Sequence, residues 1–380
     1  MREARLEALR TRLAGLGRPH TPADVASALR GLGEVVTDAS VRETVSELRR
    51  HSTGAGVLDV LLAEPGVSDV LVNGPREVFV DRGAGLERAD VTFVDDEQVR
   101  RLAIRLAAAA GRRLDDAAPF VDGRLPDGTR LHAVLAPVSE PGTCLSLRVP
   151  ARRSFALEGL VSAGSLPPDG AEVLRALVAR RVPFLISGGT GTGKSTLLSA
   201  LLALVPAEER IVLVEDAREL QPAHPHCVRL EGRPPNGEGT GAIALTTLVR
   251  QALRMRPDRV VLGEVRGGEL TDLLTALNTG HEGGCGTVHA NSIADIPARL
   301  EALAALGGLG RDACHAQVAA ALKAVIHVRR ERAGARRVAG VGVFQRRPDG
   351  LVEVVPAVSF AADGVRREQA AARLDELVSP

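Results

Sequence analysis

The chain has no tryptophan, no tyrosine and only seven phenylalanines among its 380 residues. Proteins that bind single-stranded nucleic acid stack the bases on such side chains, so this composition disfavours that class. The formal net charge of +1 gives no overall basic field for nucleic acid either. No apolar run approaches the roughly 20 residues of a membrane span, and the charged N-terminus does not resemble a signal peptide. We therefore expect a cytoplasmic protein without direct nucleic-acid contacts.

Cysteine is scarce as well. The four cysteines lie far apart and show no C-x-x-C spacing, which favours a reduced setting without disulfides. His224, His226 and Cys227 lie close together and raise the possibility of a metal site. No matching second half exists elsewhere in the chain, so this possibility is weak.

Lysine is the rarest charged residue. Of 48 lysines and arginines, only Lys194 and Lys323 are lysine, which leaves 46 arginines. Lys194 lies in the segment F-L-I-S-G-G-T-G-T-G-K-S-T, residues 184–196. Its spacing matches the P-loop pattern G-x4-G-K-[ST] without a mismatch. A compact ammonium group reaches into a phosphate nest more easily than a guanidinium fork does, so lysine is the expected residue there.

The P-loop pattern predicts a strand over 182–186, a glycine-rich turn and a helix over 196–204. Glycines allow consecutive backbone N–H groups to turn around a phosphate, and the helix start adds its positive dipole end. Lys194 would reach the β- and γ-phosphates and the Ser195 hydroxyl would ligate Mg²⁺. The predicted ATP-binding residues are Gly188, Gly189, Thr190, Gly191, Thr192, Gly193, Lys194, Ser195 and Thr196.

Two buried-type strands downstream, 211–214 and 259–262, are each followed by an acid, Glu215 and Glu264. Ligands of open α/β sheets bind at the carboxyl ends of such strands. ATP hydrolysis needs one carboxylate to hold Mg²⁺, often through water, and another to orient or deprotonate the attacking water. We assign Glu264 to the first role and Glu215 to the second. His289, after a short strand, could contact the γ-phosphate. Taken alone, each acid could instead be a strand-end or cap residue, and His289 a core histidine.

The remaining chain predicts four segments. Residues 1–50 form a charged helical segment, with Thr21 to Asp24 as a helix start. Residues 51–150 read as a mixed α/β domain, 151–165 as a linker, and 166–380 as alternating strands and helices around a parallel sheet. Arg130 and Arg148 lie at strand ends near turns in the first domain. They could face a ligand or simply belong to the surface.

Three further segments follow the P-loop in a familiar order. Residues 215–220 (E-D-A-R-E-L) resemble the "Asp box" of the type II/IV secretion ATPases, 262–266 (L-G-E-V-R) their atypical Walker B, and 279–291 their "His box". Residues 229–236, 239–241 and 254–257, together with 71–74, 111–113, 124–130 and 145–148, look most like the Tad/Flp pilus branch, the CpaF-type ATPases. Two departures stand in the His box: Gly284, where the family often has serine, and Cys285, which suggests sensitivity to oxidants.

The resemblance implies a fold, an assembly and a function. The fold would be α/β, a RecA-like P-loop NTPase C-domain with a smaller PAS-like N-domain. Six copies would form a ring that hydrolyses ATP with Mg²⁺, and Arg130 and Arg148 would approach the phosphates. The ring would dock on inner-membrane platform proteins at the inner face of the cytoplasmic membrane and act indirectly on pilins. The alternatives are a conjugation-type ATPase of type IV secretion that exports DNA or effectors, a RecA-like nucleic-acid translocase, and a non-hydrolysing nucleotide sensor.

Overall fold

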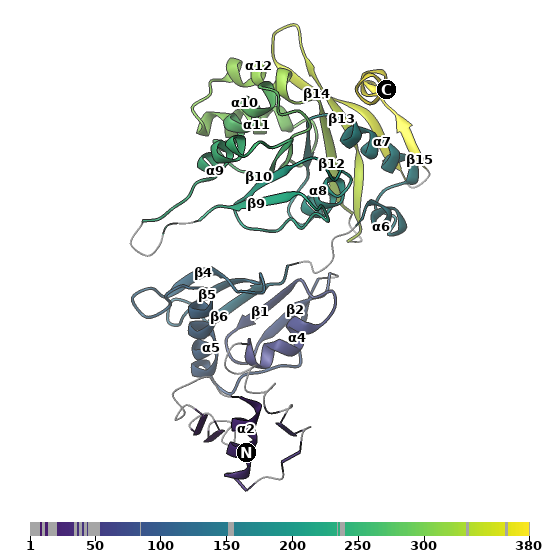
Figure 1. Cartoon of the computed structure of the whole chain (residues 1–380). Helices are drawn as coiled ribbons and strands as arrows, with labels where there is room; N and C mark the ends of the chain where they lie inside the picture. Colours follow the sequence, from purple (N-terminus) through teal and green to yellow (C-terminus); the bar gives the residue numbers. More distant parts are fainter. Residues whose placement is uncertain are drawn as a thin grey trace. The chain divides into compact units, whose positions relative to one another are not determined.

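The computed structural model describes residues 8–9, 12–13, 21–33, 36–37, 40–41, 44, 54–83, 85–150, 156–233, 235, 240–331, 334–361 and 364–379. The chain divides into two compact units, Met1–Ala151 and Arg152–Pro380 (Figure 1). Near the N-terminus, helix α2 (Pro22–Arg30) begins where the sequence predicts. Thr21 and Asp24 form its capping box, in which each side chain binds the other residue's backbone N–H group. Other parts of the predicted helical segment 1–50, such as Leu6, Val45 and Leu48, lie outside the described residues.

The first unit is built on a six-stranded antiparallel sheet. The strand order is β3-β2-β1-β6-β5-β4. Helix α5 (Asp96–Ala109) begins after the N-cap Asp95 and buries Val99, Leu102, Ala103 and Leu106, whose spacing places them on one face of the helix. The other elements are β1 (Asp69–Asn73), β2 (Val78–Asp81), β3 (Leu86–Arg88), β4 (Phe120–Arg124), β5 (Arg130–Val134), β6 (Cys144–Arg148), the 3-10 turn η1 (Gly56–Leu58) and α4 (Asp59–Ala63).

The second unit is built on a nine-stranded sheet with the order β15-β14-β13-β12-β7-β11-β10-β8-β9. Strands β12 to β9 in this order are parallel, and β13, β14 and β15 add antiparallel pairs at one edge. The bounds are β7 (Phe184–Ser187), β8 (Ile211–Glu215), β9 (Cys227–Glu231), β10 (Arg259–Val265), β11 (Cys285–Val288), β12 (Ala324–Arg330), β13 (Arg336–Arg346), β14 (Val352–Ala361) and β15 (Gly364–Arg367).

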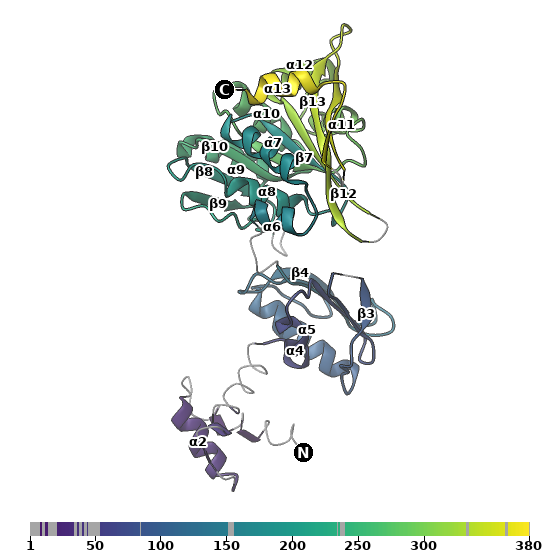
Figure 2. The same ribbon diagram turned by 90° about the vertical axis from the view of Figure 1, so that its right-hand side faces the viewer.

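Helices cover both faces of this second sheet (Figures 1 and 2). One core joins one sheet face to α6 (Leu157–Ser162), α7 (Pro168–Ala179), α8 (Lys194–Leu202) and α13 (Ala371–Val378). A second core joins the other face to α9 (Leu245–Ala252), α10 (Glu269–Asn278), α11 (Ile296–Leu306) and α12 (Arg311–Ala321); the short turn η2 (Leu253–Met255) follows α9. Central strands are therefore buried on both sides, which explains their continuous apolar sequences.

The predicted fold class, α/β with a P-loop domain of the RecA-like type, is confirmed. Two features differ from the expectation. The segment 151–165, which reads as a linker, contains α6, whose Leu157 is fully buried in the core of the second unit. The antiparallel strands β13 to β15 have no counterpart in the predicted parallel sheet, because their sequence carries no motif that distinguishes them. No helix in the described part of the chain is long and apolar enough to cross a membrane.

Candidate active site

The P-loop lies between the carboxyl end of β7 and the start of α8. Gly188, Gly191 and Gly193 have φ angles of 151°, 70° and 95°, which disfavour residues with a Cβ atom. At Gly188 a Cβ would also come within 2.2 Å of the Val328 carbonyl oxygen. Among the described residues, no backbone N–H group from Thr190 to Gly193 donates a hydrogen bond. These amides at a helix N-terminus have the donor character of a phosphate nest.

Lys194 is buried at the base of this loop, with 8% of its surface exposed. Its Nζ donates to the carbonyl oxygens of Gly188 (3.0 Å) and Gly189 (2.9 Å). The Thr192 hydroxyl also donates to the Gly189 oxygen, at 2.9 Å, and tightens the turn. Burial lowers the pKa of the Lys194 ammonium, and the nearby Glu264 carboxylate opposes that effect.

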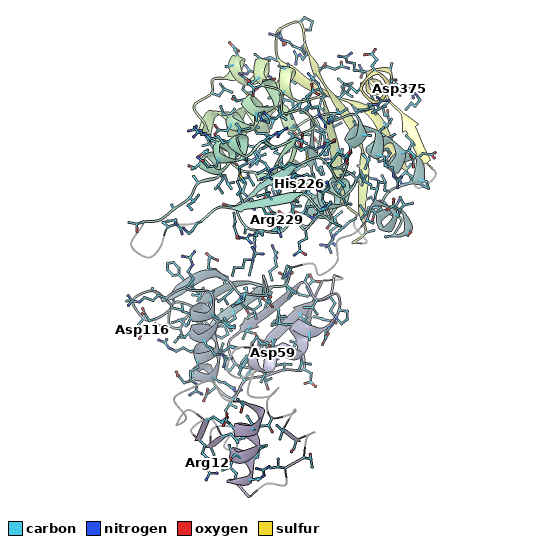
Figure 3. The ribbon with its side chains drawn as sticks, in the orientation of Figure 1. Arg12, Asp59, Asp116, His226, Arg229 and Asp375 are labelled. Carbon is cyan, nitrogen blue, oxygen red and sulfur yellow. The ribbon has the colours of Figure 1, made fainter. Side chains whose placement is uncertain are left out.

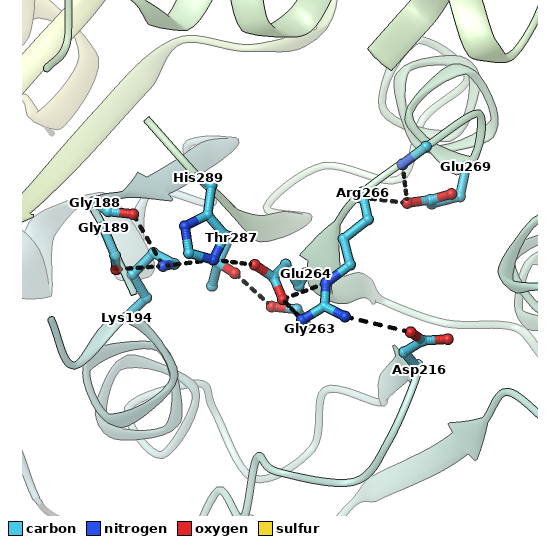
Figure 4. A network of polar contacts seen from close by, with 11 residues as sticks. Gly188, Gly189, Lys194, Asp216, Gly263, Glu264, Arg266, Glu269, Thr287 and His289 are labelled. Carbon is cyan, nitrogen blue, oxygen red and sulfur yellow. Dashed lines mark hydrogen bonds and ion pairs between the residues drawn. The ribbon is translucent and has the colours of Figure 1, made fainter. Parts of the chain in front are cut away.

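A chain of polar contacts leads from Lys194 to the end of β10 (Figure 4). His289 Nε2 lies 3.5 Å from Lys194 Nζ and 2.7 Å from Glu264 Oε1. Glu264 Oε2 accepts a 2.6 Å hydrogen bond from Arg266 Nε, and Arg266 Nη1 lies 3.6 Å from Asp216 Oδ2. The structure therefore brings together three predicted residues, Lys194, His289 and Glu264, from three neighbouring strand ends.

Two backbone features place Glu264 in this chain of contacts. The pairing of β10 with β11 shifts register between Leu262 and Val265, an irregularity that re-aims the side chains within it. The Thr287 hydroxyl donates a 2.7 Å hydrogen bond to the Gly263 carbonyl oxygen and ties β11 to this point. Burial and the neighbouring Lys194 lower the pKa of His289, although Glu264 acts in the opposite direction. The imidazole is therefore mostly neutral at pH 7.

Glu215 ends β8 in a different environment. It is 3% exposed, and its Oε1 accepts backbone hydrogen bonds from Glu219 and Leu220, each 2.9 Å long. Its Oε2 is buried without a hydrogen bond and lies 3.6 Å from Arg229 Nη2. Arg229, labelled in Figure 3, belongs to the edge strand β9. Burial raises the pKa of Glu215, and the two backbone donors and Arg229 only partly offset this. One oxygen is thus held by the loop, and the other remains available with a guanidinium beside it.

Gly263 connects the two acidic strand ends. A Cβ at this position would lie 2.6 Å from Glu215 Cγ, so the Glu215 side chain passes directly over the β10 backbone. Only a residue without a side chain permits this crossing. Glu264 follows immediately and faces His289.

The residues present fit a magnesium site, as judged by their donor chemistry. Mg²⁺ prefers hydroxyl, carboxylate and water oxygens. The Ser195 hydroxyl donates to no other described group, and the Glu264 carboxylate lies on the same sheet edge. Within the described residues no group of three or more His, Cys, Asp or Glu side chains could hold a metal by itself. This includes His224, His226 and Cys227, where the imidazole of His226 contacts Arg210 instead.

Arg130 and Arg148 both belong to the first unit, at the start of β5 and the end of β6. In register they lie directly opposite each other, and Arg124 on β4 lies opposite Arg130. Arg148 Nε also donates a 3.1 Å hydrogen bond to Asp69. Directly opposed residues project from the same sheet face, and like charges there destabilise the pairing. A row of three arginines is therefore a feature that an anion would stabilise.

In the His box, the structure contradicts the expected oxidant sensitivity of Cys285 and explains why Gly284 replaces serine. Cys285 is 1% exposed and burial raises its thiol pKa to about 12, so a reactive, oxidant-sensitive thiolate is not available. At Gly284 there is no space for serine, the residue that the family often has at this position. A Cβ there would lie 2.6 Å from Leu277 Cδ2 and 2.9 Å from the Val260 carbonyl oxygen.

We did not predict roles for Arg229, Arg266 or Thr287 from the sequence. Arg266 follows Glu264 by two residues, and its position in the segment 262–266 was a usable signal. Arg229 could not be found in this way, because it reaches Glu215 from a strand that pairs with β8 only in the folded sheet.

A sequence model of a protein family described as "Type II/IV secretion system protein" matches residues 51–355. The chain belongs to this family. Family membership and the complete P-loop make it an ATPase with a nucleotide substrate.

Two relatives of this chain have names that refer to conjugal transfer and to type IV secretion. The "Putative conjugal transfer protein Rv3659c" of Mycobacterium tuberculosis is 53% identical over 348 residues, which cover 90% of this chain and 98% of that protein. The type IV secretion system protein PtlH of Bordetella pertussis is 36% identical over 254 residues, which cover 61% of this chain and 75% of that protein. The names of these two relatives belong to the conjugal-transfer and type IV secretion class and do not refer to a Tad/Flp pilus.

Solved structures show the same fold. The pilus retraction motor PilT with bound ADP has a TM-score of 0.54 at 19% identity, and the match covers 85% of each chain. The ATPase DotB of Yersinia pseudotuberculosis has a TM-score of 0.53 at 16% identity, covering 91% of this chain and 83% of that one. At these identities the likeness concerns the fold alone.

Proposed function

We propose that this ATPase hydrolyses Mg²⁺–ATP at the edge formed by the P-loop, Glu264 and Glu215, and that its turnover drives an envelope-spanning machine. The observation that carries this proposal is the contact chain Lys194–His289–Glu264, which joins the phosphate nest to the acid of β10. A nucleotide-binding scaffold without hydrolysis would not require this chain or a second acid at the neighbouring strand end.

Each residue has a defined task in this proposal. Lys194 and the loop amides bind the β- and γ-phosphates, and Ser195 with a water on Glu264 would hold Mg²⁺. The bound metal supplies neutralisation of phosphate charge. Glu215 Oε2, the oxygen without a hydrogen bond, accepts the proton of the attacking water, and Arg229 stabilises the carboxylate form. His289 Nε2 lies between Lys194 Nζ and Glu264 Oε1 and would keep the carboxylate and the ammonium in place beside each other.

Arg130 and Arg148 would stabilise the charge that develops on the phosphates. The support is their opposed placement on one sheet face beside Arg124. The comparison of Arg130→Ala and Arg148→Ala with Arg101→Ala, an arginine on α5 outside this row, tests the assignment. The first two variants should lower kcat with little effect on the binding of ADP, and equal kcat values in all three variants would remove both arginines from the mechanism.

We further propose that the working form is a hexamer docked at the inner face of the cytoplasmic membrane on platform proteins of a Tad/Flp-type pilus. The support is the resemblance of residues 254–257 and of the N-terminal segments to that branch. Part of the segment 233–236 lies outside the described residues. A conjugation-type or type IV secretion ATPase is the second candidate, favoured by the name of the relative with 53% identity.

The test is Mg²⁺-dependent ATPase activity measured together with mass by light scattering, with and without ATP. Activity that rises with six-fold assembly and disappears in Glu215→Gln supports the motor. A stable monomer that hydrolyses ATP only with added DNA would contradict it and favour a translocase. Deletion of the gene in its host then separates the two candidates, because loss of surface pili and loss of conjugal transfer are different phenotypes.

A further inference from the structure

The hairpin of β12 and β13 lies against the P-loop. Figure 2 shows β12 and β13 side by side. All of β12 pairs with residues 336–343 of β13, and Arg330 lies opposite Arg336 in this register. The Val328 carbonyl oxygen of β12 closes over Gly188, where a Cβ would approach it to 2.2 Å. On β13, Arg336 Nε donates a 3.0 Å hydrogen bond to the Gly191 carbonyl oxygen. The hairpin therefore contacts the loop at its beginning and at its outer turn.

Arg336 is placed close to the centre of the loop. Its Cδ would lie 3.5 Å from a Cβ at Gly193, the residue that precedes α8. Lys194 binds the carbonyl oxygens of Gly188 and Gly189, and Arg336 binds that of Gly191. The two cations thus bind different carbonyl groups of the loop. Lys194 does so from the start of α8, and Arg336 does so from the β12–β13 hairpin.

The guanidinium of Arg336 retains unused donors. Only Nε makes a hydrogen bond to another described residue, so the two terminal nitrogens have no partner in the described part of the chain. Neighbouring arginines differ: Arg337 pairs with Glu331 at 3.1 Å. An exposed arginine normally pairs with a carboxylate or points into water. Arg336 instead points at the loop that is proposed to surround phosphates, and its fork geometry suits phosphate oxygens.

We propose that Arg336 is a nucleotide-binding residue that fixes the outer turn of the P-loop and directs its terminal nitrogens toward the phosphates of bound ATP or ADP. Gly191 is distant in the loop from the Lys194–His289–Glu264 contacts that mark the reacting end. The interaction is therefore made equally with ATP and ADP and contributes to binding rather than to the chemical step. The inference rests on the proposed nucleotide site at this loop.

The experiment compares Arg336→Ala with Arg330→Ala. Both variants remove one positive charge from the same hairpin, and only Arg336 contacts the P-loop. Because the chain has no tryptophan or tyrosine, dissociation constants are measured by competition with a fluorescent ADP derivative. We expect Arg336→Ala to raise the Kd of both ADP and ATP about tenfold, the effect of one charge-assisted hydrogen bond. Arg330→Ala should change them less than about twofold, and kcat should remain near that of the wild type in both.

Further variants make the outcome unambiguous. Arg336→Lys keeps the charge but loses the planar fork, so its Kd should lie between those of the wild type and Arg336→Ala. If thermal unfolding shows that Arg336→Ala does not fold, Arg336→Gln replaces it. Equal Kd values for the Arg336 and Arg330 variants would overturn the proposal, as would an effect on kcat without one on Kd. Normal nucleotide binding by Lys194→Ala would instead refute the proposed site itself.

Discussion

Glu215 and Glu264 both end buried parallel strands, and β8 and β10 are neighbours in the sheet. Their carboxylates nevertheless have different surroundings. At the end of β8, Glu215 is buried, one oxygen is held by two backbone N–H groups and the other has no hydrogen bond. At the end of β10, Glu264 also has one oxygen, Oε1, without a hydrogen bond, but this oxygen lies 2.7 Å from His289 Nε2, and Oε2 accepts a hydrogen bond from Arg266.

The difference assigns separate tasks to two acids that look alike in sequence. A carboxylate beside a cluster of cations, as at Glu264, suits the electrostatic support of a metal and phosphates. A buried carboxylate with a raised pKa suits proton transfer, because its basicity is higher than that of an exposed acid. The following experiments separate the two strand ends, beginning with the largest expected effect.

Lys194→Ala removes the buried ammonium group that lies beside His289 at the β10 end of the site. Its burial against the P-loop carbonyl groups leaves no other described lysine nearby to replace it. We expect kcat/KM for ATP to fall by on the order of 10³-fold, with weakened nucleotide binding. Steady-state kinetics and nucleotide titration measure both. Hydrolysis at the wild-type rate would show that the P-loop assignment is wrong.

Gly263→Ala perturbs the β8 end from the β10 backbone. The added methyl group would meet Glu215 Cγ at 2.6 Å and displace that side chain, while Glu264 keeps its contacts. We expect kcat to fall by about 10²-fold with nucleotide affinity nearly unchanged. Gly310→Ser is the control, because nothing lies within 4 Å of a Cβ there. Wild-type turnover in Gly263→Ala would exclude a role for the Glu215 position.

Glu215→Gln should slightly raise the stability of the folded protein at neutral pH. Because burial raises the native pKa of Glu215, its ionised form is disfavoured in the folded protein. Its contribution to stability is complete below its unfolded pKa and is lost as pH rises through the native value. The neutral glutamine avoids this loss, so Tm at pH 7.5 should rise by on the order of 2 °C. The gain should shrink toward pH 5 in thermal unfolding, and a lower Tm at both pH values would contradict the assigned environment.

Much of the fold and the site could be predicted from sequence, because local patterns determine them. The P-loop spacing predicted the loop between β7 and α8, and apolar runs located β8 and β10 within a few residues. The partners of Glu215 could not be predicted. Its backbone donors arise from the turn 216–220, and Arg229 reaches it from β9, which is adjacent only through sheet pairing. Arg336 likewise reaches Gly191 through the pairing of β12 with β7 and β13.

The division of labour between the two acids is tested most directly by single-turnover hydrolysis of ATP over a range of Mg²⁺ concentrations in Glu215→Gln and Glu264→Gln. We predict that Glu264→Gln raises the half-saturating Mg²⁺ concentration at least about tenfold, as loss of an outer-sphere ligand does. Glu215→Gln should leave that concentration unchanged and lower the saturated rate by about 10²-fold or more. An equal shift in Mg²⁺ dependence in both variants, or a shift in Glu215→Gln alone, would contradict the assignment.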